Sequence, residues 1–206
     1  VAIAETSFVI DNVVVTANKY ATKQKEVATI VNVISPLIIE STASNSMADV
    51  LNFQTGLRVE ETCSNCGVPQ IRINGLEGPY TQILMDSRPI FSSLASVYGL
   101  EQLPTGMVDR IEVIRGGGSA LYGANAIAGV VNIITKEPSR NFFNVSNSSA
   151  FTERGTYDIN TNLNASVVSE NQKAGIYLFG VPRNRQHYDR DDDGFSDIPP
   201  LNSTTA

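Results

Sequence analysis

One segment of this sequence limits its fold more than any other, because apolar and polar residues alternate along it without a break. From Tyr157 to Val167 the odd positions are Tyr, Ile, Thr, Leu, Ala and Val, and the even positions are Asp, Asn or Ser. This period of two predicts a β-strand with one apolar face, and about ten residues is the length that a tilted strand needs to cross a bilayer. Weaker segments at 142–151 and 174–185, separated by polar turns, predict antiparallel neighbours.

Two interpretations of this pattern stay open when it is taken alone. A soluble antiparallel meander alternates in the same way as the strands of a transmembrane barrel. Three strands cannot close a barrel, since the smallest have about eight, so the membrane interpretation makes this chain part of a larger protein. It also predicts that Phe143, Phe151, Tyr157 and Tyr177 belong to an aromatic girdle at the membrane interface.

Residues 29–138 have a different sequence pattern, in which short β-branched runs alternate with turns and one helical segment. Ser46 can cap a helix with Asp49 in its first turn, and Gly56 is a natural stop in the left-handed conformation. Short strands mixed with short helices predict a small α+β domain. Its expected strands lie at 29–35, 57–60, 70–74, 82–86, 108–115 and 130–135.

Composition excludes several classes of protein. A net charge of −6 and a pI near 4.8 argue against a nucleic-acid partner, which would require a basic face. No stretch approaches the roughly 18 apolar residues of a transmembrane helix, and Val1 to Val15 shows no secretory signal. Two cysteines and one histidine are too few for a structural zinc site.

A glycine run follows the expected strand at 108–115. Gly116-Gly117-Gly118 before a helix suggests a phosphate-binding loop, but Leu121 takes the place of the third glycine and no P-loop lysine follows. A tight turn with Ser119 capping a short helix fits the residues better. His187 has no nucleophile beside it, so we expect no catalytic site and no enzyme.

The same glycine run carries a family resemblance. The segment 111–123, continuing through Ala126 to 129–136, resembles the signature that ends the plug domain of TonB-dependent outer-membrane receptors. The segments 72–75 and 83–89 match the RxxG and "DG" strand turns of that family. Gly117 and Ala128 depart from its usual proline and glycine but are also small residues. The sequence of these segments is most similar to that of cobalamin (vitamin B12) receptors, and siderophore and haem receptors share most of the same residues.

The resemblance implies a fold and a division of the chain. It predicts an α+β plug, a small mixed sheet with short helices at 29–138, inside the lumen of a β-barrel. Residues 139–206 would then be the first antiparallel strands of that incomplete transmembrane barrel, surrounded by outer-membrane lipid. Residues 1–28 would be a periplasmic tether.

The tether contains a segment that resembles the TonB box, which the periplasmic protein TonB recruits. An extended β-branched segment can add its backbone to the edge of a partner's sheet, although any Val-rich strand has this character. The segment is Asp11, Asn12, Val13, Val14, Val15, Thr16 and Ala17.

Two apical loops are candidates for binding substrate. In an exported protein, Cys63 and Cys66 favour a disulfide over a redox motif, because Gly67 and Pro69 disfavour the helix on which a reactive CxxC depends. This disulfide would hold Ser64 and Asn65 in a small rigid loop. The second loop offers aromatic and hydroxyl groups for a large ligand, with ordinary packing of the aromatics as the alternative. Its candidates are Phe91, Ser92, Ser93 and Tyr98.

An acidic segment at 189–197 has the spacing of a calcium loop. Carboxylates occupy positions one, three, five and nine, Gly194 is sixth, and Pro200 replaces the glutamate expected at twelve. No cofactor is required otherwise, and a solvated acidic loop remains the alternative. The expected ligands are Asp189, Asp191, Asp193 and Asp197 and the carbonyl of Phe195.

These features together favour transport. The resemblance implies TonB-dependent uptake of a large scarce nutrient, cobalamin or else haem or an iron-siderophore, across a Gram-negative outer membrane. The alternatives are a soluble calcium-binding or adhesion module and, less favoured, a nucleotide-binding enzyme.

Overall fold

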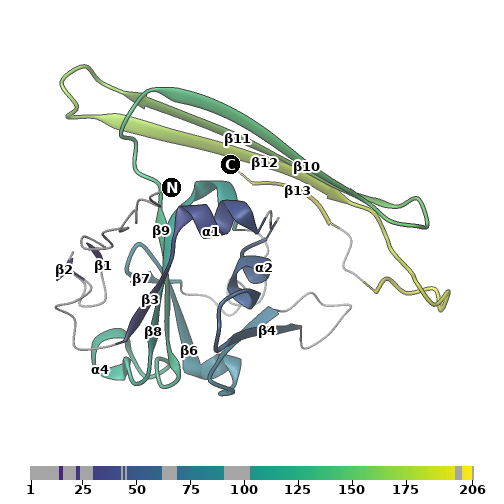
Figure 1. Cartoon of the computed structure of the whole chain (residues 1–206), viewed down its shortest axis with the longest axis horizontal. Coiled ribbons are helices and arrows are strands. Elements are labelled where there is room, and N and C mark those ends of the chain that lie inside the picture. Colours follow the sequence, from purple (N-terminus) through teal and green to yellow (C-terminus); the bar gives the residue numbers. More distant parts are fainter. Residues whose placement is uncertain are drawn as a thin grey trace, which may run out of the picture.

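The computed structural model places two β-structures side by side, a compact mixed sheet with helices and a long meander that crosses one side of it (Figure 1). It describes residues 14–15, 22–23, 30–42, 44, 46–61, 69–90, 103–197 and 201–205. No helix within these ranges is long and apolar enough to cross a membrane.

The mixed sheet has five strands in the order β3-β8-β9-β6-β7. Only β6 and β9 pair in parallel; the other neighbours are antiparallel. A β4–β5 hairpin forms a separate small sheet beside it. The strands are β3 (Val31–Ile34), β4 (Leu57–Glu61), β5 (Pro69–Ile73), β6 (Thr81–Met85), β7 (Arg88–Pro89), β8 (Val108–Arg115) and β9 (Gly129–Thr135).

Short helices cover the mixed sheet and complete its core. The larger cluster includes Ile39 of α1, Leu51 of α2 and Ile111 of β8, while Tyr122 of α4 packs in a smaller cluster with Leu84. Two 3-10 turns, η2 and η3, precede β6 and β8. The helices are α1 (Pro36–Ser41), α2 (Met47–Asn52), η2 (Gly78–Tyr80), η3 (Thr105–Met107) and α4 (Ser119–Tyr122).

Helix α2 begins as its sequence predicts. The Ser46 hydroxyl accepts from the Asp49 N–H at 3.2 Å and donates to the Asp49 carboxylate at 2.8 Å, so two polar groups at the helix start satisfy each other. Gly56 adopts φ +79 after the helix. Helix α1 was not predicted: Pro36 ends β3, but it also starts a helix, because a proline at the first helical position loses no hydrogen bond.

Gly129, the first residue of β9, closes the sheet through a backbone contact. A Cβ on Gly129 would lie 2.3 Å from the Ile114 carbonyl oxygen, so β8 and β9 can approach only without a side chain there. The expectation that Ser119 caps the following helix is wrong in detail. Helix α4 begins at Ser119 itself, so its N-cap is Gly118.

The turn between β6 and β7 is fixed to β9 by side chains. Asp86 and Ser87 both have positive φ, which suits a tight hairpin turn. The Asp86 carboxylate accepts from the N–H and hydroxyl of Thr135 at 2.9 and 2.8 Å. Buried Asn132 accepts from the Ser87 N–H at 2.9 Å. This network explains why the Met-Asp-Ser-Arg turn holds a strained backbone without glycine.

The meander is an antiparallel sheet in the order β10-β11-β12-β13. Its first three strands match the alternating segments, and β13 was not predicted because its five residues show little alternation. The strands are β10 (Phe142–Phe151), β11 (Tyr157–Val168), β12 (Gly175–Arg185) and β13 (Leu201–Thr205). Before the compact sheet, β1 (Val14–Val15) pairs antiparallel with β2 (Thr22–Lys23).

Candidate functional site

The meander has its polar face turned inward. On β11, Asn160, Asn164 and Ser166 are buried, with 1%, 7% and 2% of their surface exposed. Apolar Val167 and its neighbour Leu178 on β12 are both 61% exposed. A soluble sheet buries its apolar face, so this arrangement does not fit a soluble module and does fit a wall with lipid outside and a polar lumen.

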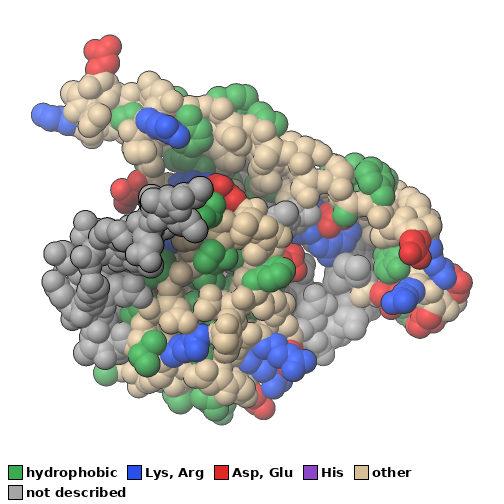
Figure 2. All heavy atoms as spheres, viewed as in Figure 1, with side chains coloured by type: hydrophobic (Ala, Val, Ile, Leu, Met, Phe, Trp, Pro, Cys, Tyr) green, Lys and Arg blue, Asp and Glu red, His purple; other side chains and the backbone are tan. Residues whose placement is uncertain are grey.

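The outer face also has the charge distribution of such a wall. Charged side chains gather at the two ends of the meander, and the strands between them show uncharged and hydrophobic groups (Figure 2). Phe143 and Phe151, 73% and 74% exposed, lie near opposite ends of β10, where a girdle would place them. Tyr177 is different: it pairs with Ser166 in register and therefore lies on the inner face.

The inner face is held against the compact part at η3. The Tyr177 hydroxyl lies 3.2 Å from the Gly106 carbonyl oxygen and 2.9 Å from Asn164 Oδ1. Lys136 Nζ donates to the same Gly106 carbonyl at 3.0 Å. Phe179, two residues along β12, packs against the larger core cluster, so a meander side chain helps to close the compact core.

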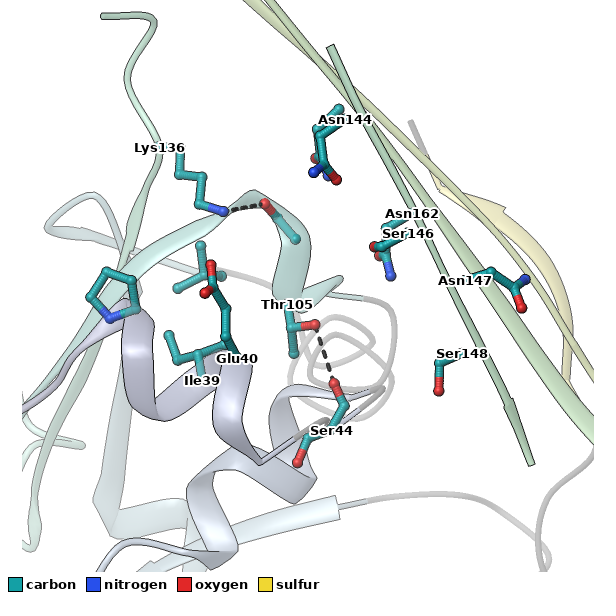
Figure 3. Close-up of a pocket in the computed structure, with 14 residues that line it drawn as sticks. Ile39, Glu40, Ser44, Thr105, Lys136, Asn144, Ser146, Asn147, Ser148 and Asn162 are labelled. Carbon is teal, nitrogen blue, oxygen red and sulfur yellow. Dashed lines mark hydrogen bonds between the residues drawn. The ribbon is translucent and has the colours of Figure 1, made fainter. Parts of the chain in front are cut away.

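Beside this contact, the two parts stand apart around a cavity of about 400 Å³. Glu40 of α1, Thr105 and Lys136 line one side of it (Figure 3). The Thr105 hydroxyl donates to the Ser44 carbonyl at 3.3 Å and holds η3 to the connection between α1 and α2. The opposite side is a polar surface of amides and hydroxyls from the inner face of β10 and β11, namely Asn144, Ser146, Ser148, Asn162 and Asn164.

Along the inner face of β10, β11 and β12, charged side chains occur only in one cluster. Arg183 binds Asp158 through Nε and Nη2 at 3.2 and 2.8 Å, and Arg185 Nε reaches the same carboxylate at 3.0 Å. Arg183 is buried and its partners are nearly so. This ion-paired group joins β11 to β12 near the ends that lead into the loops at 152–156 and 186–200.

The acidic loop brings together three of its predicted ligands. One carboxylate oxygen from each of Asp189, Asp191 and Asp197 lies within 4.8 Å of the other two. Asp193 lies outside this group, and its carboxylate accepts from the Phe195 N–H at 2.8 Å. Oxygen atoms at this spacing could hold Ca²⁺.

Asp189 accepts hydrogen bonds from the backbone of its own loop. Its carboxylate accepts from the N–H groups of Asp192 and Gly194 at 2.7 and 2.9 Å. Desolvation acts to raise the pKa of Asp189, but these donors outweigh it and lower the pKa. Arg154, at the tip of the β10–β11 hairpin, pairs with Asp192 at 2.5 Å, and this hydrogen-bonded pairing raises the pKa of Arg154. The two neighbouring loops are therefore tied together.

Several predicted site residues lie outside the described residues. These are Cys63, Ser64, Asn65 and Cys66, the second apical group Phe91, Ser92, Ser93 and Tyr98, and Asp11, Asn12, Val13, Thr16 and Ala17 of the box. Val14 and Val15 form β1. The contact at Gly106 was missed, because its acceptor is a backbone carbonyl. The register of β12 could have indicated that Tyr177 faces inward.

Comparison with known proteins agrees with this arrangement. A family model described as TonB-dependent Receptor Plug Domain matches residues 23–130, more than half of the chain. The vitamin B12 transporter BtuB of Vibrio vulnificus strain CMCP6 is 38% identical over 125 residues, which are 61% of this chain and 20% of that protein. BtuB of strain YJ016 is 28% identical over 174 residues, covering 81% of this chain and 28% of that protein.

A solved structure extends the likeness to the fold of both parts. The siderophore receptor PirA from Acinetobacter baumannii superposes with a TM-score of 0.66 and 25% identity, over 83% of this chain and 26% of that chain.

The fold and its inverted wall define a plug followed by the first, unclosed strands of a barrel. The chain belongs to the TonB-dependent receptor plug domain family. It spans about a fifth of the length of the BtuB relative from strain CMCP6. From here on, "plug" means the compact part, residues 30–136, and "wall" means β10–β13.

Proposed function

We propose that this chain belongs to a TonB-dependent transporter that takes up a large scarce nutrient across the outer membrane of a Gram-negative bacterium. The observation that carries the proposal is the inverted wall, whose polar inner face packs against the plug. A plug held there occludes a lumen, and an occluded lumen requires energy and movement for passage. The relatives are named as a transporter and a receptor, which supports the same class.

TonB is the proposed source of that movement. Residues 11–17 would pair with TonB in the periplasm by backbone hydrogen bonds. The tether then leads to β3, which lies at the edge of the plug sheet and pairs only with β8 among the described strands. A pull from the N-terminal side therefore acts first on an edge strand, while β8, β9 and β6 remain paired to one another.

Cobalamin is the first candidate ligand, because the BtuB relatives are named as vitamin B12 transporters. Siderophores come second, since similar solved structures are siderophore receptors, and haem is the third candidate. The ligand would rest on apical loops 63–66 and 91–98. Calcium bound by Asp189, Asp191 and Asp197 would order the neighbouring outer loop.

A ligand panel tests this function. The intact receptor would be produced in cells that lack their own receptors, and uptake of labelled cyanocobalamin, haem and ferric siderophores would be measured with and without TonB. We expect concentrative uptake of cyanocobalamin that requires TonB. Accumulation of none of these compounds would contradict the proposal, and accumulation of a ferric siderophore alone would change the ligand but keep the class.

A further inference from the structure

The strongest unexplained feature is the convergence of two side-chain donors on one backbone atom, the carbonyl oxygen of Gly106. Lys136 Nζ and the Tyr177 hydroxyl reach it at 3.0 and 3.2 Å. Gly106 belongs to η3 of the plug, whereas Tyr177 belongs to β12 of the wall. Two donors, one from each part, therefore point at a single acceptor between them.

The contact is closely fitted to a residue without a side chain. A Cβ on Gly106 would lie 3.3 Å from Asn162 Oδ1 and from Asn164 Nδ2, which is tighter than ordinary van der Waals contact. The Tyr177 ring is supported by Phe142 of β10, at 6.0 Å between ring centroids. Gly106, Lys136 and Asn164 also line the cavity between plug and wall. The Gly106 contact is thus where the two parts meet at the edge of a gap.

Tyr177 has one hydroxyl hydrogen and two acceptors within reach. It can donate to Gly106 of the plug or, at 2.9 Å, to Asn164 Oδ1 on its own wall. If the plug moves away, the hydroxyl stays satisfied by Asn164, so no buried donor is left unpaired. A contact of this kind holds the plug in place and still opens at low cost.

We propose that Tyr177 is a positioning residue that holds η3 against the wall, that Lys136 braces η3 from within the plug, and that exchange of the Tyr177 hydrogen bond from Gly106 to Asn164 accompanies release of the plug during transport. The proposal rests on the proposed function, because it assigns to this contact the closed position of a moving plug. The Tyr177 contact acts through the backbone of η3 and involves no contact with the ligand.

Tyr177→Phe in the intact receptor removes the hydroxyl and keeps the ring. Tyr157→Phe is the matched control, since Tyr157 lies on the opposite face of the neighbouring strand. The N–H of Lys136 bonds to the Met107 carbonyl and that of Met107 to Pro104, so their amide hydrogen exchange reports on η3. We expect exchange at both amides to become about fivefold faster in Tyr177→Phe, the factor that one hydrogen bond represents. Lys136→Met should produce a similar increase at the Met107 amide.

Uptake separates positioning from a purely structural role. In Tyr177→Phe, the maximal rate of TonB-dependent uptake of cyanocobalamin should rise while the concentration for half-maximal uptake stays within about twofold of wild type, as expected when only the release step changes. Exchange equal to that of Tyr157→Phe would overturn the proposed contact. Faster exchange with an unchanged maximal rate would make the contact structural and overturn its role in release. If the wild type takes up no ligand, the proposed function fails instead, and hydrogen exchange still reports on the contact.

Discussion

Single residues decide how closely parts of this protein approach one another. Gly129 allows β8 and β9 to pair, and Gly106 allows η3 to reach the wall. Asn160 and Asn164 are buried although they are polar, because they form the inner face of the wall. A residue's burial here follows from which side of the wall it occupies and from the backbone it must accommodate, more than from its hydrophobicity.

Gly129→Ala tests the residue at which the surrounding backbone leaves the least room for a side chain. Its Cβ would meet the Ile114 carbonyl at 2.3 Å, at φ +153, so the β8–β9 pairing must shift. We expect the plug to lose about 3 kcal/mol or more of stability, measured as an earlier loss of protease resistance on heating the intact receptor. Gly117→Ala is the control, since a Cβ there meets nothing within 4 Å. Equal loss in both variants would show that the backbone contact has no special cost.

At the scale of elements, periodicity predicted most of the fold. The bounds of β8 and β10 agree with their sequence patterns, since a strand long enough to alternate, or rich in β-branched residues, carries its own signal. Helix α1 and strand β13 were missed because Pro36 fits either a strand end or a helix start, and five residues show too little pattern. The inner position of Tyr177 depends on the length of the 169–174 turn, which sets the register of β12.

The inverted wall predicts opposite responses on its two faces. Leu163, near the middle of β11, lies on the outer face, so Leu163→Lys should destabilise the folded receptor in lipid by about 2–4 kcal/mol. Ser146→Lys lies on the inner face beside the cavity and should be tolerated. The folded fraction in lipid vesicles, followed by heat-modifiable electrophoresis, measures both. A tolerated Leu163→Lys with an unfolded Ser146→Lys would reverse the assignment of the faces.

The structure of the acidic loop predicts its calcium ligands more specifically than the spacing of its carboxylates in the sequence. Asp191 and Asp197 belong to the group of three neighbouring carboxylates, whereas Asp193 lies outside it. Calcium should bind the intact receptor with a Kd of about 10⁻⁴ M. By titration calorimetry, Asp191→Asn and Asp197→Asn should weaken binding much more than Asp193→Asn. Equal effects of all three would favour the ligand set expected from spacing alone.

The whole molecule combines a polar-faced wall, a plug closed against it and an N-terminal segment, the proposed tether, that leads to the plug's edge strand. Sequence alone predicted the two parts and their family. It could not predict how they meet, because the Tyr177–Gly106 contact and the cavity each depend on residues far apart in the chain. The functional claim that unites these features is that movement of the tether by TonB drives transport.

Energised uptake in Val14→Pro tests that claim most directly. Proline removes a backbone donor from the segment expected to pair with TonB, while Ser7→Pro, outside residues 11–17, is the control. In cells with TonB, we predict that Val14→Pro binds cyanocobalamin at the surface with wild-type affinity but accumulates no more than cells without TonB, and that Ser7→Pro accumulates it normally. Full accumulation by Val14→Pro would contradict the account.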